Sequence, residues 1–101
     1  MIKMVTKTIY GTVSKDGEII SGTGFLVERQ STGTYLIDFE PGFANVPSVV
    51  GSQTGYGKID ENTLDSVVFP YINRGSATVL TGNASGDKRD RQFSFTAIGE
   101  Q

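Results

Sequence analysis

Residues 24–39 read GFLVERQSTGTYLIDF, two segments of alternating side chains joined by a turn that ends in Gly33. A period of two is typical of half-buried β-strands, because successive side chains point to opposite faces of a sheet. Glycine takes the left-handed conformation freely, so a three-residue loop over 31–33 is a favourable hairpin connection. A loop one residue longer or shorter would mix the two faces, which favours this register. The register pairs Phe25 with Phe39, Val27 with Ile37 and Arg29 with Tyr35.

The rest of the chain consists of short β-rich segments separated by turn signals. We expect further strands over 1–13, 49–51, 64–72, 77–80 and 92–98. The Asp16-Gly17 pair predicts another hairpin. In it, Val13 faces Ile20 across a two-residue loop or Ile19 across a three-residue loop. No segment has helical periodicity, so seven or eight strands predict one all-β domain over residues 1–101, a single antiparallel β-sandwich.

Residues 40–47 contain two prolines and connect strands rather than forming one, because proline cannot donate to a ladder. We expect Phe43 and Val46 to close the end of the core where this loop crosses it. The final strand turns three residues inward, and these are Phe93, Phe95 and Ala97.

Residues 64–72 are apolar on both faces, and Pro70 predicts a bulge within them. A two-residue loop over 74–75 pairs Ile72 with Ala77 and Phe69 with Leu80. A strand apolar on both sides lies between two layers or shows its second face to another protomer. The residues assigned to an oligomer interface are Val67, Phe69, Tyr71, Leu80, Leu26 and Leu36.

Missing residue types exclude several functions. The chain has no Cys and no His, which excludes Cys/His zinc sites, thiol nucleophiles and Ser-His-Asp triads within it. A net charge of −2 argues against a nucleic-acid-binding platform. No stretch approaches the ~20 apolar residues of a membrane helix, and residues 1–4 lack the apolar core of a signal peptide. We expect no nucleic acid and no membrane insertion.

Glu28 and Asp38 form a pair of carboxylates on one face of the predicted hairpin. Glycoside hydrolysis needs a proton donor and a nucleophile or base. In the predicted register the two residues are diagonal neighbours, roughly 7–8 Å apart at the backbone. No neighbouring residue would raise the pKa of one of them selectively. We therefore expect a protein without catalytic activity and without a cofactor.

Several short motifs occur in an order that is found in a known domain. They are YGTV at 10–13, DG at 16–17, GxGF at 22–25, GxYxIxF at 33–39, Phe43, PxV at 47–49 and FxFxAIG at 93–99. In this order they resemble a bacterial and phage β-domain found at the ends of collagen-like and tail-fibre-like proteins. The outline is also similar to that of H-type lectins, sandwiches that trimerise and bind N-acetylgalactosamine-type sugars between protomers. The resemblance implies a lectin-like or jelly-roll-like sandwich; the lectins' histidine-containing sugar site and cysteine bridge have no counterpart here.

Polar loops carry the candidate ligand-binding residues. An exposed aromatic ring can stack on a sugar while amides and charged groups bind its hydroxyls. For Tyr56, a ring folded back over the sandwich end is the favoured alternative. For residues 87–91, the favoured alternative is a solvated loop with weak salt bridges. The residues assigned to carbohydrate binding are Tyr56, Lys58, Asp60, Asn73, Arg74, Asp87 and Arg89.

Oxygen ligands for Ca²⁺ occur in two loops, but their spacing does not match an EF-hand, and we expect no metal site. The residues concerned are Asp60, Glu61, Asp65, Asn83 and Asp87. The expected function is non-catalytic recognition of a carbohydrate or a cell-surface receptor by a homotrimer. The alternative is a structural trimerisation or capping domain of a fibre or tail-like assembly. Either role favours an extracellular or virion-associated protein.

Overall fold

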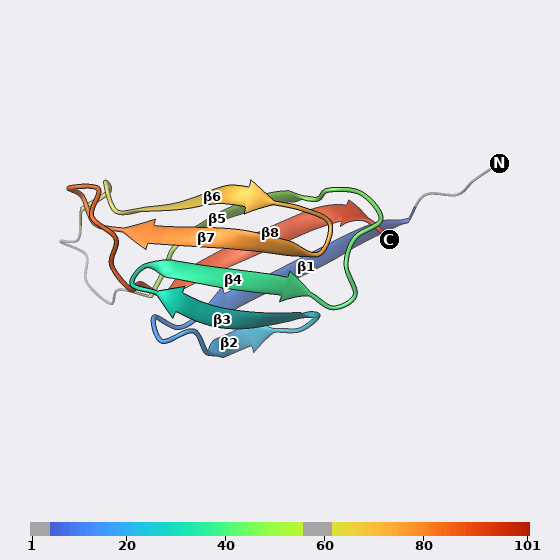
Figure 1. The fold of residues 1–101 in the computed structure, drawn as a ribbon, viewed down its shortest axis with the longest axis horizontal. Coiled ribbons are helices and arrows are strands. Elements are labelled where there is room, and N and C mark those ends of the chain that lie inside the picture. The colour runs from blue at the N-terminus through green and yellow to red at the C-terminus, as the bar shows by residue number, and fades with distance from the viewer. Residues whose placement is uncertain (1–4, 56–61) are drawn as a thin grey trace.

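The computed structural model describes residues 5–55 and 62–101 and contains two packed layers of β-strands (Figure 1). The described residues form eight strands and no helix, so the predicted antiparallel β-sandwich is confirmed. The strands are β1 (Thr6–Val13), β2 (Ile19–Gly22), β3 (Phe25–Ser31), β4 (Thr34–Phe39), β5 (Ser48–Gln53), β6 (Ser66–Ile72), β7 (Ser76–Gly82) and β8 (Phe93–Glu100). Within the described residues, no helix is long or apolar enough to cross a lipid bilayer.

Each layer is a four-stranded antiparallel sheet. Sheet A has the strand order β2-β1-β8-β5, and sheet B has the order β3-β4-β7-β6. In Figure 1 sheet B lies in front, with β1, β8 and β5 of sheet A behind it. The Gln53 side chain joins the two layers, because its Nε2 donates to the carbonyls of Ser66 at 2.9 Å and Gly82 at 2.7 Å.

The β3–β4 hairpin has the predicted register. Phe25 lies opposite Phe39, Val27 opposite Ile37 and Arg29 opposite Tyr35. However, the ladder is irregular between Arg29 and Ser31, so Ser31 pairs with Thr34 and ends β3 instead of beginning the loop. Gly33 adopts a φ of 65°, as the predicted loop requires. A Cβ at this position would also lie 2.6 Å from the carbonyl oxygen of Thr81. Gly33 is therefore needed both for its backbone conformation and for the close approach of β7.

The β1–β2 hairpin resolves the two registers that the sequence left open. Val13 pairs with Ile19, and the amide of Ser14 donates to the carbonyl of Glu18 at 2.8 Å across a three-residue loop. The register then shifts between Thr12 and Val13.

The core fills the space between the sheets with aromatic and branched aliphatic side chains. Three aromatic pairs lie within it, Phe25–Phe95, Tyr35–Phe93 and Phe39–Phe43, with ring centroids 4.9, 5.2 and 5.0 Å apart. The inward orientation predicted for the last strand is confirmed, and the buried residues are Ile9, Val13, Phe25, Tyr35, Ile37, Phe39, Phe43, Ala77, Val79, Phe93, Phe95 and Ala97.

The crossing loop over 40–47 closes one end of this core. Phe43 is buried as predicted, and Lys7 Nζ lies 4.5 Å from its ring centroid. The same ammonium donates to the carbonyls of Pro41 and Gly42. Val46 was expected to share the closing role, but it is 61% exposed. The buried proline in this loop is Pro47, which occupies the place expected for Val46.

The β6–β7 hairpin differs from the predicted register beyond its turn. Ile72 pairs with Ala77 as expected, but Leu80 faces Val68 rather than Phe69. The cause is an irregularity between Val68 and Tyr71, which contains the predicted bulge at Pro70. An irregular residue reverses the direction of the side chains that follow it. Tyr71 therefore points outward, and Ile72 packs on the core.

Candidate functional site

The end of the sandwich where β5 and β7 finish and β8 begins contains a cleft of about 320 Å³. Three segments that lie far apart in the sequence form it: the β1–β2 turn, the residues after β5 and the residues before β8. The lining residues are Ser14, Lys15, Asp16, Thr54, Gly55, Asp90, Arg91 and Gln92. We call this feature the end cleft.

Asp90 attaches one wall of the end cleft to the β3–β4 hairpin. Its Oδ2 accepts a hydrogen bond from Arg29 Nε at 3.0 Å, and its Oδ1 accepts one from the Gly33 amide at 2.8 Å. The hydrogen bond from Arg29 is the largest cause that lowers the pKa of Asp90, and the Gly33 amide adds to it. The same interaction raises the pKa of Arg29. Asp90 therefore stays ionised, and its backbone position is set from two sides.

Arg91 is oriented by a carboxylate beneath it. Its Nη1 donates to Asp65 Oδ2 at 3.0 Å. The Asp65 side chain is only 2% exposed, whereas that of Arg91 is 27% exposed. Among residues 5–55 and 62–101, Asp65 Oδ1 has no hydrogen-bond partner. Because Asp65 occupies only one edge of the guanidinium, Arg91 can present its other N–H groups to a ligand in the end cleft.

The β1–β2 turn is anchored by a buried tyrosine. The Tyr35 hydroxyl donates to the carbonyl of Lys15 at 2.7 Å, and its ring lies in the core. Burial is the main cause that raises the pKa of Tyr35. The Lys15 and Asp16 side chains are exposed on this fixed turn. They therefore provide a cation and an anion at the rim without themselves supporting the core.

Gln92 forms the floor of the end cleft beside Thr54. Its Nε2 lies 3.4 Å from Thr54 Oγ1, and Thr54 Oγ1 lies 3.0 Å from Ser94 Oγ. Gly55 has a φ of 76°, and a Cβ there would collide with the Gln92 amide. Glycine at this position thus lets the Gln92 side chain lie flat against the backbone of the β5 end.

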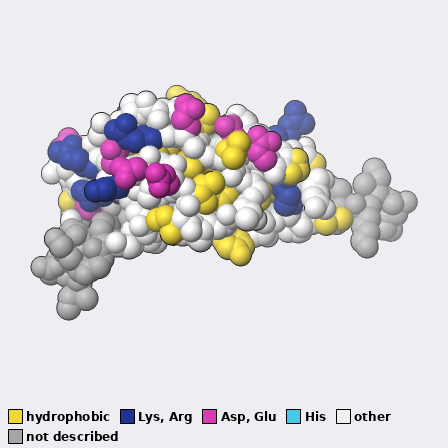
Figure 2. Space-filling view, turned by 90° about the horizontal axis from the view of Figure 1, so that it is seen from below, with side chains coloured by type: hydrophobic (Ala, Val, Ile, Leu, Met, Phe, Trp, Pro, Cys, Tyr) yellow, Lys and Arg dark blue, Asp and Glu magenta, His cyan; other side chains and the backbone are white. Residues whose placement is uncertain are grey.

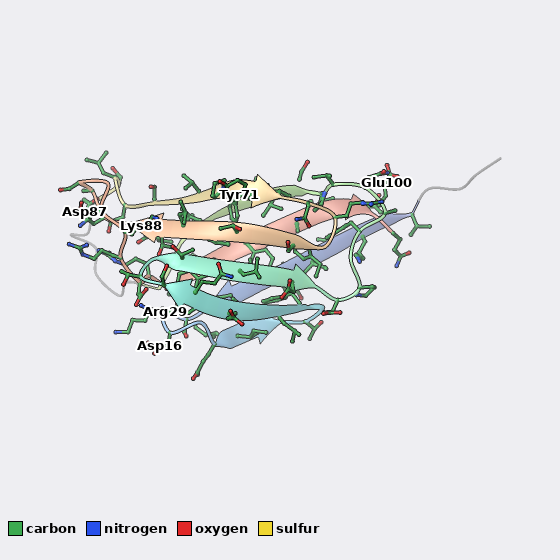
Figure 3. All side chains as sticks on the ribbon, in the orientation of Figure 1. Asp16, Arg29, Tyr71, Asp87, Lys88 and Glu100 are labelled. Carbon is green, nitrogen blue, oxygen red and sulfur yellow. The ribbon has the colours of Figure 1, made fainter. Side chains whose placement is uncertain are left out.

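The end cleft lies in the most highly charged region of the described surface. Both signs of charge gather toward the left end of the molecule in Figure 2. Figure 3 shows Asp16 and Arg29 close together at this end, with Lys88 above them and Asp87 farther toward the tip. The described charged residues of this region are Lys15, Asp16, Arg29, Asp65, Asp87, Lys88, Arg89, Asp90 and Arg91. The site can donate and accept hydrogen bonds, but it does not present one sign of charge.

The structure does not bring the predicted carbohydrate-binding residues into one site. Tyr56, Lys58 and Asp60 lie outside the described residues. Asn73 and Arg74 form the β6–β7 turn, at the opposite end of the sandwich from the end cleft. The Asn73 carboxamide oxygen accepts hydrogen bonds from the amides of Gly75 and Ser76, so its role is to close that turn.

Asp87 and Arg89 lie at the same end as the cleft, where the Arg89 amide donates to the carbonyl of Thr81 near the end of β7, but they do not line the cleft. Their side chains form a long, exposed ion pair of 3.9 Å. Sequence reasoning missed five lining side chains, Ser14, Lys15, Asp16, Thr54 and Gln92. Among these residues, only Asp16 belongs to a recognisable sequence motif, the Asp16-Gly17 pair. That motif predicts a hairpin turn and not a binding site.

The two groups of oxygen ligands do not come together as a metal site in the described chain. No cluster of three or more His, Cys, Asp or Glu occurs among residues 5–55 and 62–101. Asp65 is paired with Arg91, and Asn83 Oδ1 accepts from the amides of Ser85 and Asp87. Asp60 and Glu61 are outside the described residues.

The outer face of sheet B carries a second distinct surface. Leu26 is 58% exposed and Tyr71 73% exposed, and Leu36 and Leu80 are half-buried between them. Val68 faces Leu80 across the β6–β7 ladder and is also exposed. Val67 and Phe69, which were assigned to an oligomer interface, instead pack against the core of the same chain. We call the exposed set Leu26, Leu36, Val68, Tyr71 and Leu80 the sheet B patch.

No protein-family model, curated protein or solved structure matches this chain. The resemblance to tail-fibre-like domains and H-type lectins therefore remains a prediction from the sequence motifs, and function has to be argued from the geometry of the surface.

Proposed function

We propose that this chain is a non-catalytic recognition module that binds a carbohydrate in the end cleft. The observation that carries the proposal is the convergence of Asp16 from the β1–β2 turn with Arg91 and Gln92 from the segment before β8 on one cleft of about 320 Å³. A carboxylate, a guanidinium and an amide together provide donors and acceptors in fixed planes. Sugar hydroxyls both donate and accept, so they can use all three groups. A charged ligand would be repelled by some of these residues and attracted by others, because the cleft contains side chains of both signs.

Preorganisation supports the same function. Asp90 and Arg91 are held by Arg29 and Asp65, and the Lys15 backbone is held by Tyr35. A ligand therefore does not have to order these segments when it binds, which reduces the entropic cost of binding. A site built only from solvated loops would lack this framework.

Binding to a glycan array, followed by calorimetric titration, tests the proposal. Lys15→Ala and Asp16→Ala remove exposed rim side chains without removing core contacts. Each substitution should weaken binding by about 3- to 30-fold, because it removes one or two hydrogen bonds to the sugar. Lys88→Ala and Asp87→Ala are matched controls, because these exposed charges lie at the same end but outside the cleft, and they should leave affinity unchanged. Equal losses from both pairs would indicate nonspecific electrostatics and contradict the proposal.

The sheet B patch favours a second function, assembly with other copies of the chain as a structural domain. Tyr71, Leu26 and Val68 are large apolar residues on one sheet face, and such faces favour protein contacts. This function predicts an oligomer whose size is independent of concentration in sedimentation experiments. Tyr71→Asp should dissociate it, whereas Tyr10→Asp on the opposite sheet should not. A monodisperse monomer would rule out this role for the patch.

A further inference from the structure

The outer face of sheet A is free of charge across the middle of three adjacent strands. Its side chains alternate with the buried residues of β1 and β8, so the outward positions follow from the register. Most of them end in hydroxyl groups. These positions are Thr8, Tyr10, Thr12, Ser94, Thr96, Ile98, Ser48, Val50 and Ser52. This face can form hydrogen bonds and apolar contacts but no ion pairs, whereas the highly charged end of the molecule can form ion pairs as well.

A shallow groove of about 360 Å³ lies over the β5–β8 ladder on this face. Three registered pairs line it, Val50 with Thr96, Gly51 with Phe95, and Ser52 with Ser94. The side chain is absent at Gly51, where a Cβ would lie 2.5 Å from the Ser94 carbonyl oxygen. The edge strand β5 can therefore lie close against β8.

A chain of hydrogen bonds connects the groove to the end cleft. Thr12 Oγ1 lies 2.8 Å from Ser94 Oγ, and Ser94 Oγ lies 3.0 Å from Thr54 Oγ1. Gln92 Nε2 then donates to Thr54 Oγ1 at 3.4 Å. Ser94 lines the groove, whereas Thr54 and Gln92 line the cleft. A row of hydrogen-bonded polar side chains thus lies between the two hollows.

An apolar row crosses the groove at its far end. Tyr10, Thr96 and Val50 are cross-strand neighbours, and Tyr10 and Val50 are 64% and 66% exposed. An exposed tyrosine ring can stack on the C–H face of a pyranose while its hydroxyl remains in water. A path from Gln92 to Thr96 along β8 is roughly 13 Å long at the usual rise per residue. This length exceeds that of a single sugar ring.

The geometry points to an extended, uncharged oligosaccharide as the ligand, with one end in the end cleft and the chain lying along the β5–β8 groove to Tyr10. This inference rests on the proposed function and adds the class of ligand to it. The hydroxyl-rich path provides hydrogen bonds to neutral sugars and no ion pair for an acidic or basic one. A polyanionic glycan would gain nothing along this path.

The test uses the whole chain and neutral gluco- and N-acetylglucosamine oligosaccharides of one to six units, with an alginate oligosaccharide as the polyanion. Affinity should rise with the length of the neutral chain until the path is filled. Tyr10→Ala and Val50→Glu should each weaken binding of the longest neutral oligosaccharide about ten-fold. Neither substitution should change the affinity for the single sugar, which occupies only the cleft. Tyr71→Ala is the matched control, because it removes a similarly exposed tyrosine from the opposite sheet.

The outcomes separate this inference from the proposed function. Equal affinity for short and long sugars, unaffected by Tyr10→Ala but lost in Asp16→Ala, would overturn the extended path and leave the cleft in place. Failure of every sugar to bind would overturn both. Tighter binding of alginate would contradict the choice of a neutral ligand. If Tyr10→Ala converts a dimer to a monomer and changes no sugar affinity, the face is a contact between copies of the chain and the inference is wrong.

Discussion

Asp90 connects the charged loop before β8 to the first hairpin of sheet B through both of its oxygens. Its pKa is lowered in the folded protein, chiefly by the hydrogen bond from Arg29. The folded state therefore binds fewer protons than the unfolded state when the pH falls below the ordinary value of 3.8. The stabilisation is fully present above that value and is lost as the pH falls through the lowered pKa.

Asp90→Asn should make the protein less stable at neutral pH, because the charge that pairs with Arg29 is gone. The difference between wild type and variant should shrink as the pH falls from 3.8 through the lowered pKa, because the wild-type carboxylate is protonated first in the unfolded state and then in the folded state. Urea unfolding followed by circular dichroism across this range measures the difference. A stability difference that stays constant down to the acid limit would show that the charge of Asp90 has no part in it.

Asp65→Ala should lower the free energy of unfolding by about 1–3 kcal/mol, because it leaves the partly buried Arg91 guanidinium without its partner. The same substitution should weaken ligand binding, since Arg91 loses its fixed orientation in the end cleft. Asp87→Ala is the control, because its ion pair with Arg89 is 3.9 Å long and exposed on both sides. That variant should remain within about 0.5 kcal/mol of wild type. Equal effects in the two variants would contradict the role given to Asp65.

The two faces of β6 make different contributions, which a pair of substitutions can separate. Phe69 packs against the core, whereas Tyr71 is 73% exposed. Phe69→Ala should cost about 2 kcal/mol of stability, less than a fully buried phenylalanine would. Tyr71→Ala should change the stability of the single chain by no more than about 0.5 kcal/mol. Thermal unfolding of both variants measures this, and the reverse order would show that the irregularity at Pro70 is misplaced.

Individual elements differ in how far the sequence predicts them. The β3–β4 register could be predicted because a slip would have placed Asp38 in the core, so the two faces distinguish one register from its neighbours. The register of β6 could not, because Val67, Val68, Phe69 and Tyr71 are apolar on either face. Pro70 indicated that a bulge was present but not how many residues it would shift. The position of Tyr71 depends on that shift.

At the scale of the whole molecule, the sandwich brings together residues that no local pattern connects. The end cleft needs the β1–β2 turn, the end of β5 and the start of β8 at one end of the two sheets. Sequence reasoning placed Arg74 and Arg89 in one site, although the strands between them carry the two residues to opposite ends. Loop composition identified polar segments, but only the strand order determines which of them meet.

Amide chemical shifts of the ¹⁵N-labelled chain, followed during titration with the highest-affinity sugar from the array, test whether the end cleft binds a carbohydrate. The largest changes should fall on residues 14–16, 54–55 and 90–92, with smaller changes along β5 and β8. Changes confined to the sheet B patch, or to the Asn73–Gly75 turn at the opposite end, would contradict binding in the end cleft.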